Sequence, residues 1–185
     1  MHKRIAKFML SDFSKSYDYD VGYLEHMAEV SPGAFYRYLL CTPFATHRKK
    51  APPKSYLITK LVATKYFDCG PCLRLVINMA REAKIDDKLI HAALLGNESE
   101  LPEDLVVARR YAIAVTEQDA AALLSLEEKI VQRWGEGALT EMAVAVAFAA
   151  FFPILRRGMG HAHSCEPVIQ ELTKLLATEG SVQPA

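Results

Sequence analysis

Residues 56–80, YLITKLVATKYFDCGPCLRLVINMA, place a Cys-Gly-Pro-Cys turn between two segments of helical periodicity. Before the turn, Leu57, Leu61 and Thr64 fall on one helical face. After it, apolar residues recur at helical spacing as far as Ala80. The turn is therefore expected to join two helices, which disfavours a redox fold in which such a turn follows a β-strand.

The same alternation of helical segments and breaks continues along the rest of the chain. Prolines and glycines mark the helix ends, and no segment shows the alternating pattern of a half-buried strand. The sequence predicts a single all-α domain over residues 1–185, with N-terminal helices within 1–50 and C-terminal helices within 120–177. Besides the helix that begins at the cysteine turn and reaches Ala80, the expected helices cover residues 31–45, 53–67, 86–95, 101–115, 120–134, 138–155 and 165–177.

The expected helix at residues 138–155 consists mostly of Ala, Val and Phe. A helix that is apolar nearly all round belongs in the core or at a subunit interface. Its apolar run, residues 142–155, contains Pro153 and is shorter than the roughly 20 residues that span a bilayer. We therefore expect a buried helix and no membrane association.

Composition excludes several classes of function. The chain has 22 Lys and Arg residues and 22 Asp and Glu residues, so no summed positive field favours nucleic acid. Residues 1–10 lack the apolar core of a signal peptide. Four cysteines, of which two are closely spaced, do not form the framework of a secreted disulfide-rich protein. A cytoplasmic protein with one special thiol pair is expected.

Cys69 and Cys72 are the candidate catalytic residues. Residues three apart lie on the same face of a helix, close enough for a disulfide. The amides and the dipole at a helix N-terminus stabilise a thiolate, so at least one thiol should be more acidic than a free cysteine. Asp68 is expected to cap this helix through its carboxylate. One thiol would attack and the other resolve, and the sequence does not assign these roles.

Two other interpretations of the cysteines remain open. The pair could be half of a zinc site if the fold brought His161, His163 and Cys165 close to it. The cysteines could also be buried and inert, as is expected of Cys41. The histidines follow a glycine-rich break at residues 158–160, which most simply lets the chain turn. No cofactor-binding site and no metal site are predicted.

The segment Asp68-Cys69-Gly70-Pro71-Cys72-Leu73-Arg74-Leu75-Val76-Ile77-Asn78-Met79-Ala80, in all-helical surroundings, resembles the alkylhydroperoxidase D-like (carboxymuconolactone decarboxylase-like) superfamily. The resemblance covers roughly residues 50–115. It implies a compact helical fold, frequent homo-oligomers and a CxxC pair that reduces hydroperoxides with electrons from a protein dithiol. It also makes the second cysteine, Cys72, the better candidate for the first attack.

The chain departs from the peroxidase members of that family in their proton relay. The positions of the relay glutamate and two histidines hold Leu57, Pro71 and Val76 here, none of which can transfer a proton. Positioned acid–base groups typically supply about 10²–10⁴-fold in rate, so slow peroxidase turnover is expected. The nearest groups that could supply protons instead are Lys65, Tyr66 and Asp68.

The leading hypothesis is a thiol–disulfide redox protein in which Cys69 and Cys72 act on a hydroperoxide or disulfide substrate. One rival is a non-catalytic helical homo-oligomer with structural cysteines. Another is a small-ligand binder that keeps the family's shape without its reaction. A working pair must expose a sulfur, whereas a structural pair should resist alkylation.

Overall fold

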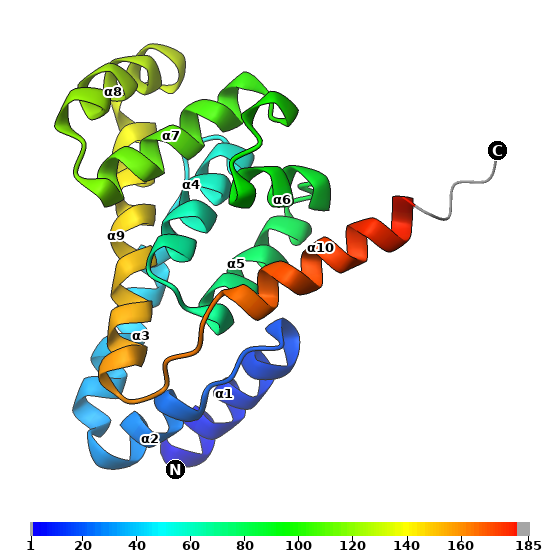
Figure 1. Cartoon of the computed structure of the whole chain (residues 1–185). Coiled ribbons are helices and arrows are strands. Elements are labelled where there is room, and N and C mark those ends of the chain that lie inside the picture. Colours follow the sequence, from blue (N-terminus) through cyan, green and yellow to red (C-terminus); the bar gives the residue numbers. More distant parts are fainter. Residues whose placement is uncertain (1, 181–185) are drawn as a thin grey trace.

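The computed structural model describes residues 2–180. In that range the chain forms α-helices and one short 3-10 helix, η1 (Glu98–Glu100), with no strand, which confirms the all-α prediction (Figure 1). The α-helices are α1 (His2–Tyr17), α2 (Gly22–Val30), α3 (Pro32–Ala45), α4 (Pro53–Tyr66), α5 (Gly70–Glu82), α6 (Asp87–Leu95), α7 (Glu103–Glu117), α8 (Ala120–Trp134), α9 (Glu136–Gly158) and α10 (Glu166–Gly180).

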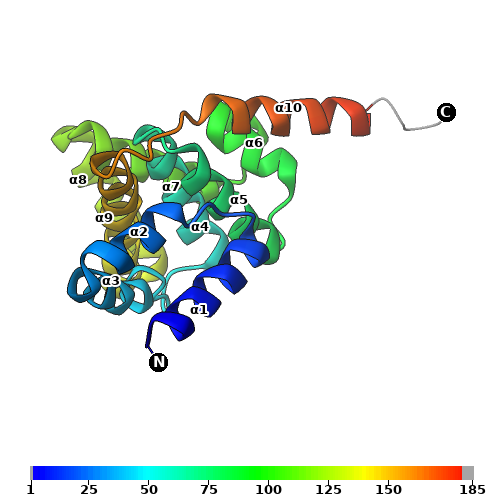
Figure 2. The same cartoon turned by 90° about the horizontal axis from the view of Figure 1, so that it is seen from below.

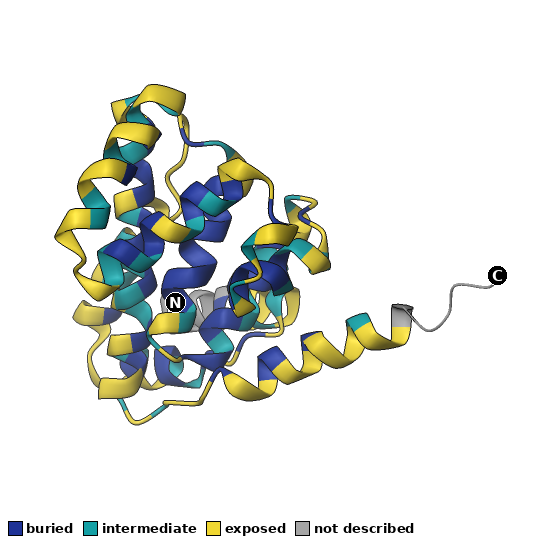
Figure 3. Ribbon diagram, turned by 45° about the horizontal axis from the view of Figure 1, so that its top comes forward, coloured by how far each residue is buried: buried dark blue, intermediate teal, exposed yellow. Residues whose placement is uncertain are grey.

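Helix α4 forms the centre of the molecule. All ten residues of its segment 55–64 are buried, and the helix packs against α5, α7 and α9 (Figures 1 and 3). A helix covered on several sides needs apolar residues around most of its circumference. The segment supplies them, with Lys60 as its one charged residue. Lys60 is buried with its neighbours.

Helix α9 is longer than expected and is buried on one side. It extends from Glu136 to Gly158 through Pro153, and an 18-residue window within it has a mean hydropathy of 2.0. Length and composition would allow it to cross a membrane, a test that core helices of soluble proteins also pass. Only 39% of that window is buried within the chain, so one side of the helix packs in the core, and burial of the other side at a subunit interface stays a prediction. Phe151 and Ile154 lie on its exposed side.

The N-terminal helices α1 to α3 enclose a second, smaller core with buried Tyr23 and Phe35. Arg156 of α9 joins this core to the rest of the molecule. Its side chain is fully buried, and its guanidinium donates to the backbone carbonyls of Asp20 at 2.7 Å and His161 at 2.8 Å, and to the Asp20 carboxylate. The guanidinium carbon also lies 5.0 Å from the centre of the Tyr23 ring.

A buried carboxylate fixes the loop that leads into α4. The Glu141 side chain on α9 accepts hydrogen bonds from the backbone N–H groups of Lys49 at 2.8 Å, Lys50 at 2.9 Å and Ala51 at 2.8 Å. These amides precede the first turn of α4, which begins at Pro53. Glu141 thus sets where α4 starts relative to α9.

Candidate functional site

Cys69 and Cys72 lie at the N-terminus of α5, joined by a disulfide with Cα atoms 5.3 Å apart. Figure 2 shows α5 between α1 and α10, and both of these helices contact it. The cysteine at position 69 is the N-cap residue, and its Sγ accepts from the backbone N–H of Cys72 at 3.4 Å. The predicted pairing geometry is therefore present at the expected end of the helix.

Asp68 does not cap α5, contrary to the prediction. Its backbone adopts a left-handed conformation, with φ of 46°, and its carboxylate accepts from the backbone N–H of Cys165 at 2.7 Å and the Ser164 hydroxyl at 3.3 Å. The residue next to the helix, Cys69, takes the N-cap position instead. Asp68 thus holds the start of α10 against the cysteine turn.

The segment 161–165 lies directly against the cysteine turn. The backbone N–H of Gly70 donates to the carbonyl of His163 at 2.8 Å. A Cβ atom added at Gly70 would lie 2.3 Å from the backbone oxygen of Ser164. This close approach of two backbones explains why the first residue of α5 is glycine.

Substitution of Gly70 by alanine is expected to lower the free energy of unfolding by about 1–3 kcal/mol, because the new methyl group must displace backbone rather than a flexible side chain. Urea unfolding measures the change. Gly158→Ala is the matched control, since nothing lies within 4 Å of a Cβ added there. Equal unfolding free energies for the two variants would contradict the close packing of this turn.

Cys165 is a third thiol beside the pair. It is buried, and its backbone N–H donates to the Asp68 carboxylate at 2.7 Å. Burial raises the pKa of Cys165 to about 12, and the neighbouring Asp68 carboxylate contributes to the increase. A thiol with this pKa is a poor nucleophile at neutral pH.

The histidines do not complete a zinc site with the cysteine pair. The ring centre of His161 lies 6.3 Å from that of Tyr23, and His163 is exposed. Across residues 2–180, no three His, Cys, Asp or Glu side chains are grouped so that they could hold a metal ion. The glycine-rich break instead lets the chain return to the cysteine turn.

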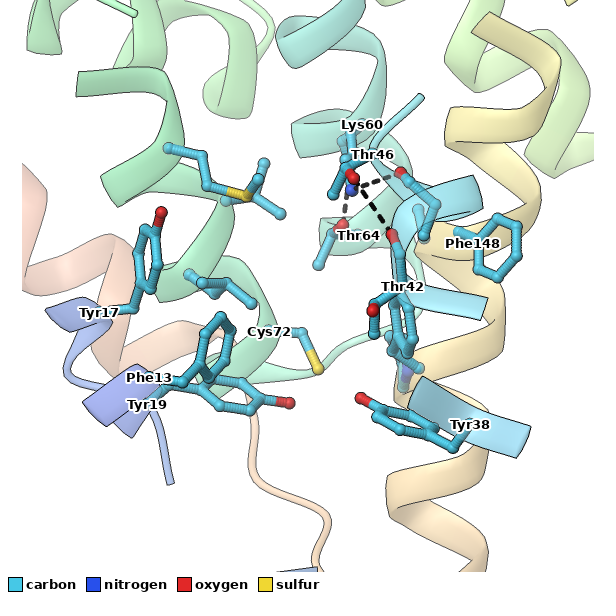
Figure 4. A pocket seen from close by; sticks show the side chains of 17 residues that line it. Phe13, Tyr17, Tyr19, Tyr38, Thr42, Thr46, Lys60, Thr64, Cys72 and Phe148 are labelled. Carbon is cyan, nitrogen blue, oxygen red and sulfur yellow. Dashed lines mark hydrogen bonds between the residues drawn. The ribbon is translucent and has the colours of Figure 1, made fainter. Parts of the chain in front are cut away.

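Cys72 lines a cavity of about 210 Å³ between the N-terminal helices and helices α4, α5 and α9. Figure 4 shows its sulfur directed into this space, with the hydroxyl groups of Tyr19 and Tyr38 nearby. Cys69 is not among the lining residues. The aromatic residues of the lining are Phe13, Tyr17, Tyr19, Tyr38, Phe148 and Phe152.

Lys60 also lines the cavity and was not predicted as a site residue. Its ammonium group donates to the carbonyl of Ala45 at 3.2 Å, and burial lowers the pKa of Lys60 to about 8. Thr46 and Thr64 also line this cavity (Figure 4). A signal was available in the sequence, because Lys60 is the one charged residue in an otherwise uncharged stretch at 55–64.

The groups proposed from the sequence as proton sources lie outside the cavity lining. Tyr66 is 52% exposed, the Lys65 ammonium donates to the carbonyl of Leu94, and Asp68 binds the start of α10. Of the three positions that correspond to the relay, Val76 lines the cavity.

A chain of tyrosine hydroxyls, which the sequence did not suggest, borders the cavity near Cys72. The hydroxyl of Tyr23 lies 3.1 Å from that of Tyr19 and 3.1 Å from that of Tyr38. Burial raises the pKa of Tyr23 and of Tyr38 above the usual value, so both stay protonated at neutral pH. Both hydroxyls can therefore act as hydrogen-bond donors near Cys72.

The fold and site define an all-α structure with a disulfide-bonded cysteine pair at a helix N-terminus, one of whose sulfurs faces an aromatic-lined cavity. Comparison of the chain with known protein families, with curated proteins and with solved structures found no match. The resemblance to the alkylhydroperoxidase D-like superfamily therefore rests on the residues of the cysteine segment and their helical setting.

Proposed function

We propose that the protein is a thiol–disulfide oxidoreductase that reduces hydroperoxides with the Cys69–Cys72 pair. The observation that carries the proposal is the position of the two sulfurs. They are bonded to each other at a helix N-terminus, and the Cys72 sulfur faces a cavity that could admit a small substrate. Hydrogen bonding and the helix dipole at such a position favour a thiolate in the reduced protein.

The reaction would proceed in two steps. The Cys72 thiolate attacks the terminal oxygen of the hydroperoxide, the O–O bond breaks, and the alkoxide takes up the proton released from the thiol. The products are an alcohol and a sulfenic acid on Cys72. The Cys69 thiol then attacks that sulfur, which releases water and forms the disulfide. A protein dithiol in a reducing compartment such as the cytoplasm would regenerate the pair by disulfide exchange.

One observation favours a rival function. Cys69 is 3% and Cys72 is 5% exposed, as expected for a structural disulfide in a non-catalytic helical protein. In our proposal the substrate reaches Cys72 through the cavity, so the low exposure does not prevent the reaction. Reactivity toward hydroperoxide separates these two functions.

The test is to treat the reduced protein with an organic hydroperoxide and to follow the Cys69–Cys72 disulfide by mass spectrometry. Stoichiometric disulfide formation is expected in the wild type and in Cys41→Ser, whose cysteine is not among the residues that line the cavity. Cys72→Ser should consume no peroxide, because the attacking sulfur is absent. Cys69→Ser should consume one equivalent of peroxide and stop at the sulfenic acid on Cys72. Intact thiols in the wild type, or turnover in both site variants, would rule out the proposal.

A further inference from the structure

The cavity beside Cys72 combines a buried amine with a wall of aromatic rings, and the proposed redox steps use neither. The amine belongs to Lys60 in the middle of α4. The rings come from helices α1, α3 and α9 and from the segment after α1. Tyr38 and Phe152 lie with ring centres 5.7 Å apart, and Phe148 and Phe152 with ring centres 5.6 Å apart.

The ammonium of Lys60 has no anionic partner among the side chains that the structure describes. The residue is 5% exposed, and its ammonium group donates to the neutral carbonyl of Ala45. An ammonium has three N–H donors, so two of them remain for other acceptors. Glu82 and Lys60 border a second hollow, but the Glu82 carboxylate accepts from the Tyr17 hydroxyl and makes no ion pair with the amine.

We propose that the cavity binds a small aryl carboxylate, with the carboxylate group on the Lys60 ammonium and the ring among the aromatic side chains. A buried charge is unfavourable unless it is paired, and an anionic ligand group would supply the missing partner. Hydrogen bonds between an ammonium and a carboxylate are also stronger than those between neutral groups. Burial lowers the pKa of Lys60 to about 8, so at neutral pH most molecules carry the charge that the ligand requires.

The size and lining of the cavity indicate which groups the ligand should carry besides its carboxylate. A cavity of about 150 Å³ lined by apolar side chains can hold benzene, and this one has a volume of about 210 Å³. The additional volume fits a short chain that carries the carboxylate. Aromatic rings pack favourably edge to face against a bound ring. Hydrocinnamate has this composition, with one ring, two methylene groups and one carboxylate.

The test measures binding of hydrocinnamate to the full-length protein in its disulfide form by isothermal titration calorimetry at pH 7. Hydrocinnamamide, the neutral amide of nearly the same shape, is titrated in parallel. Lys60→Met removes the charge and keeps a long apolar side chain in the buried position. Lys65→Met is the matched control, since Lys65 lies on the same helix and donates outside the cavity to the carbonyl of Leu94.

The wild type and Lys65→Met are expected to bind the acid at least about tenfold more tightly than the amide, as a charge-assisted hydrogen bond would give. Lys60→Met should lose that preference. The comparison of acid with amide in the wild type needs no variant and so does not depend on how Lys60→Met folds. Equal affinity for acid and amide in the wild type, preference for the acid retained in a folded Lys60→Met, or no binding up to about 10 mM would overturn the proposal.

Discussion

Substitution of Arg156 by alanine is expected to lower the free energy of unfolding by about 3–5 kcal/mol, the usual effect of removing one member of a buried charged network. The guanidinium is fully buried and donates to two backbone carbonyls and to the Asp20 carboxylate. Its loss would leave these carbonyls without their donor. It would also leave an empty space against the faces of the Tyr19 and Tyr23 rings, which the guanidinium now covers. Urea unfolding provides the measurement.

Arg157→Ala is the matched control for this substitution. The Arg157 side chain is exposed and donates to the carbonyl of Phe67, so its removal should cost about 1 kcal/mol or less. Arg156→Lys should recover only part of the stability, since one ammonium cannot reproduce the planar set of donors. A small loss for Arg156→Ala would show that α9 and the N-terminal helices associate without this contact. Tyr19 lines the cavity, so ligand binding in Arg156→Ala should weaken as well.

Substitution of Glu141 by alanine should destabilise the protein by about 3 kcal/mol or more at pH 7, because the N–H groups of Lys49, Lys50 and Ala51 lose their acceptor. Each unsatisfied buried donor costs about 1–3 kcal/mol. Chemical denaturation of the variant beside the wild type measures the loss. Glu136→Ala, at the first residue of the same helix and exposed, is the control and should change little.

The contribution of Glu141 to the free energy of unfolding should also depend on pH. Burial by itself would raise the pKa of this carboxyl, but the hydrogen bonds from Ala51, Lys49 and Lys50 outweigh it and hold the pKa below the usual value. A lowered pKa in the folded state gives stability that is present above the unfolded value of about 4.3 and is lost as the pH falls through the folded value. The difference in unfolding free energy between wild type and Glu141→Gln should therefore shrink below about pH 4. A constant difference would argue against a charged Glu141.

The sequence predicted the helices well where the chain carries strong local signals. Gly96 ends α6 in the left-handed conformation, and α8 covers residues 120–134 as expected, closed by Gly135. These ends depend on the backbone preferences of single residues, so they can be read without the tertiary structure. Helix α9 was also predicted to continue through Pro153, and it extends two residues before and three residues after the expected range 138–155.

The candidate site was predicted only in part for a related reason. The thiol pair is local in sequence and was found. The acceptor for the Gly70 amide, the partner of Asp68 and the burial of Lys60 all depend on segments that are distant in the chain. Lysine in a helix is usually solvated, and only the position of α4 between other helices changes that expectation. The cavity has the same origin, since its walls come from both ends of the sequence.

The thiol of Cys165 has a practical consequence for chemical labelling. With a pKa of about 12, roughly one molecule in 10⁵ carries the thiolate at pH 7. Alkylating reagents react with thiolates, so a native protein treated with iodoacetamide would be modified first at the partly exposed Cys41. The same low reactivity keeps a disulfide between residues 69 and 72 from migrating to the adjacent sulfur, and a stored sample should keep a single connectivity.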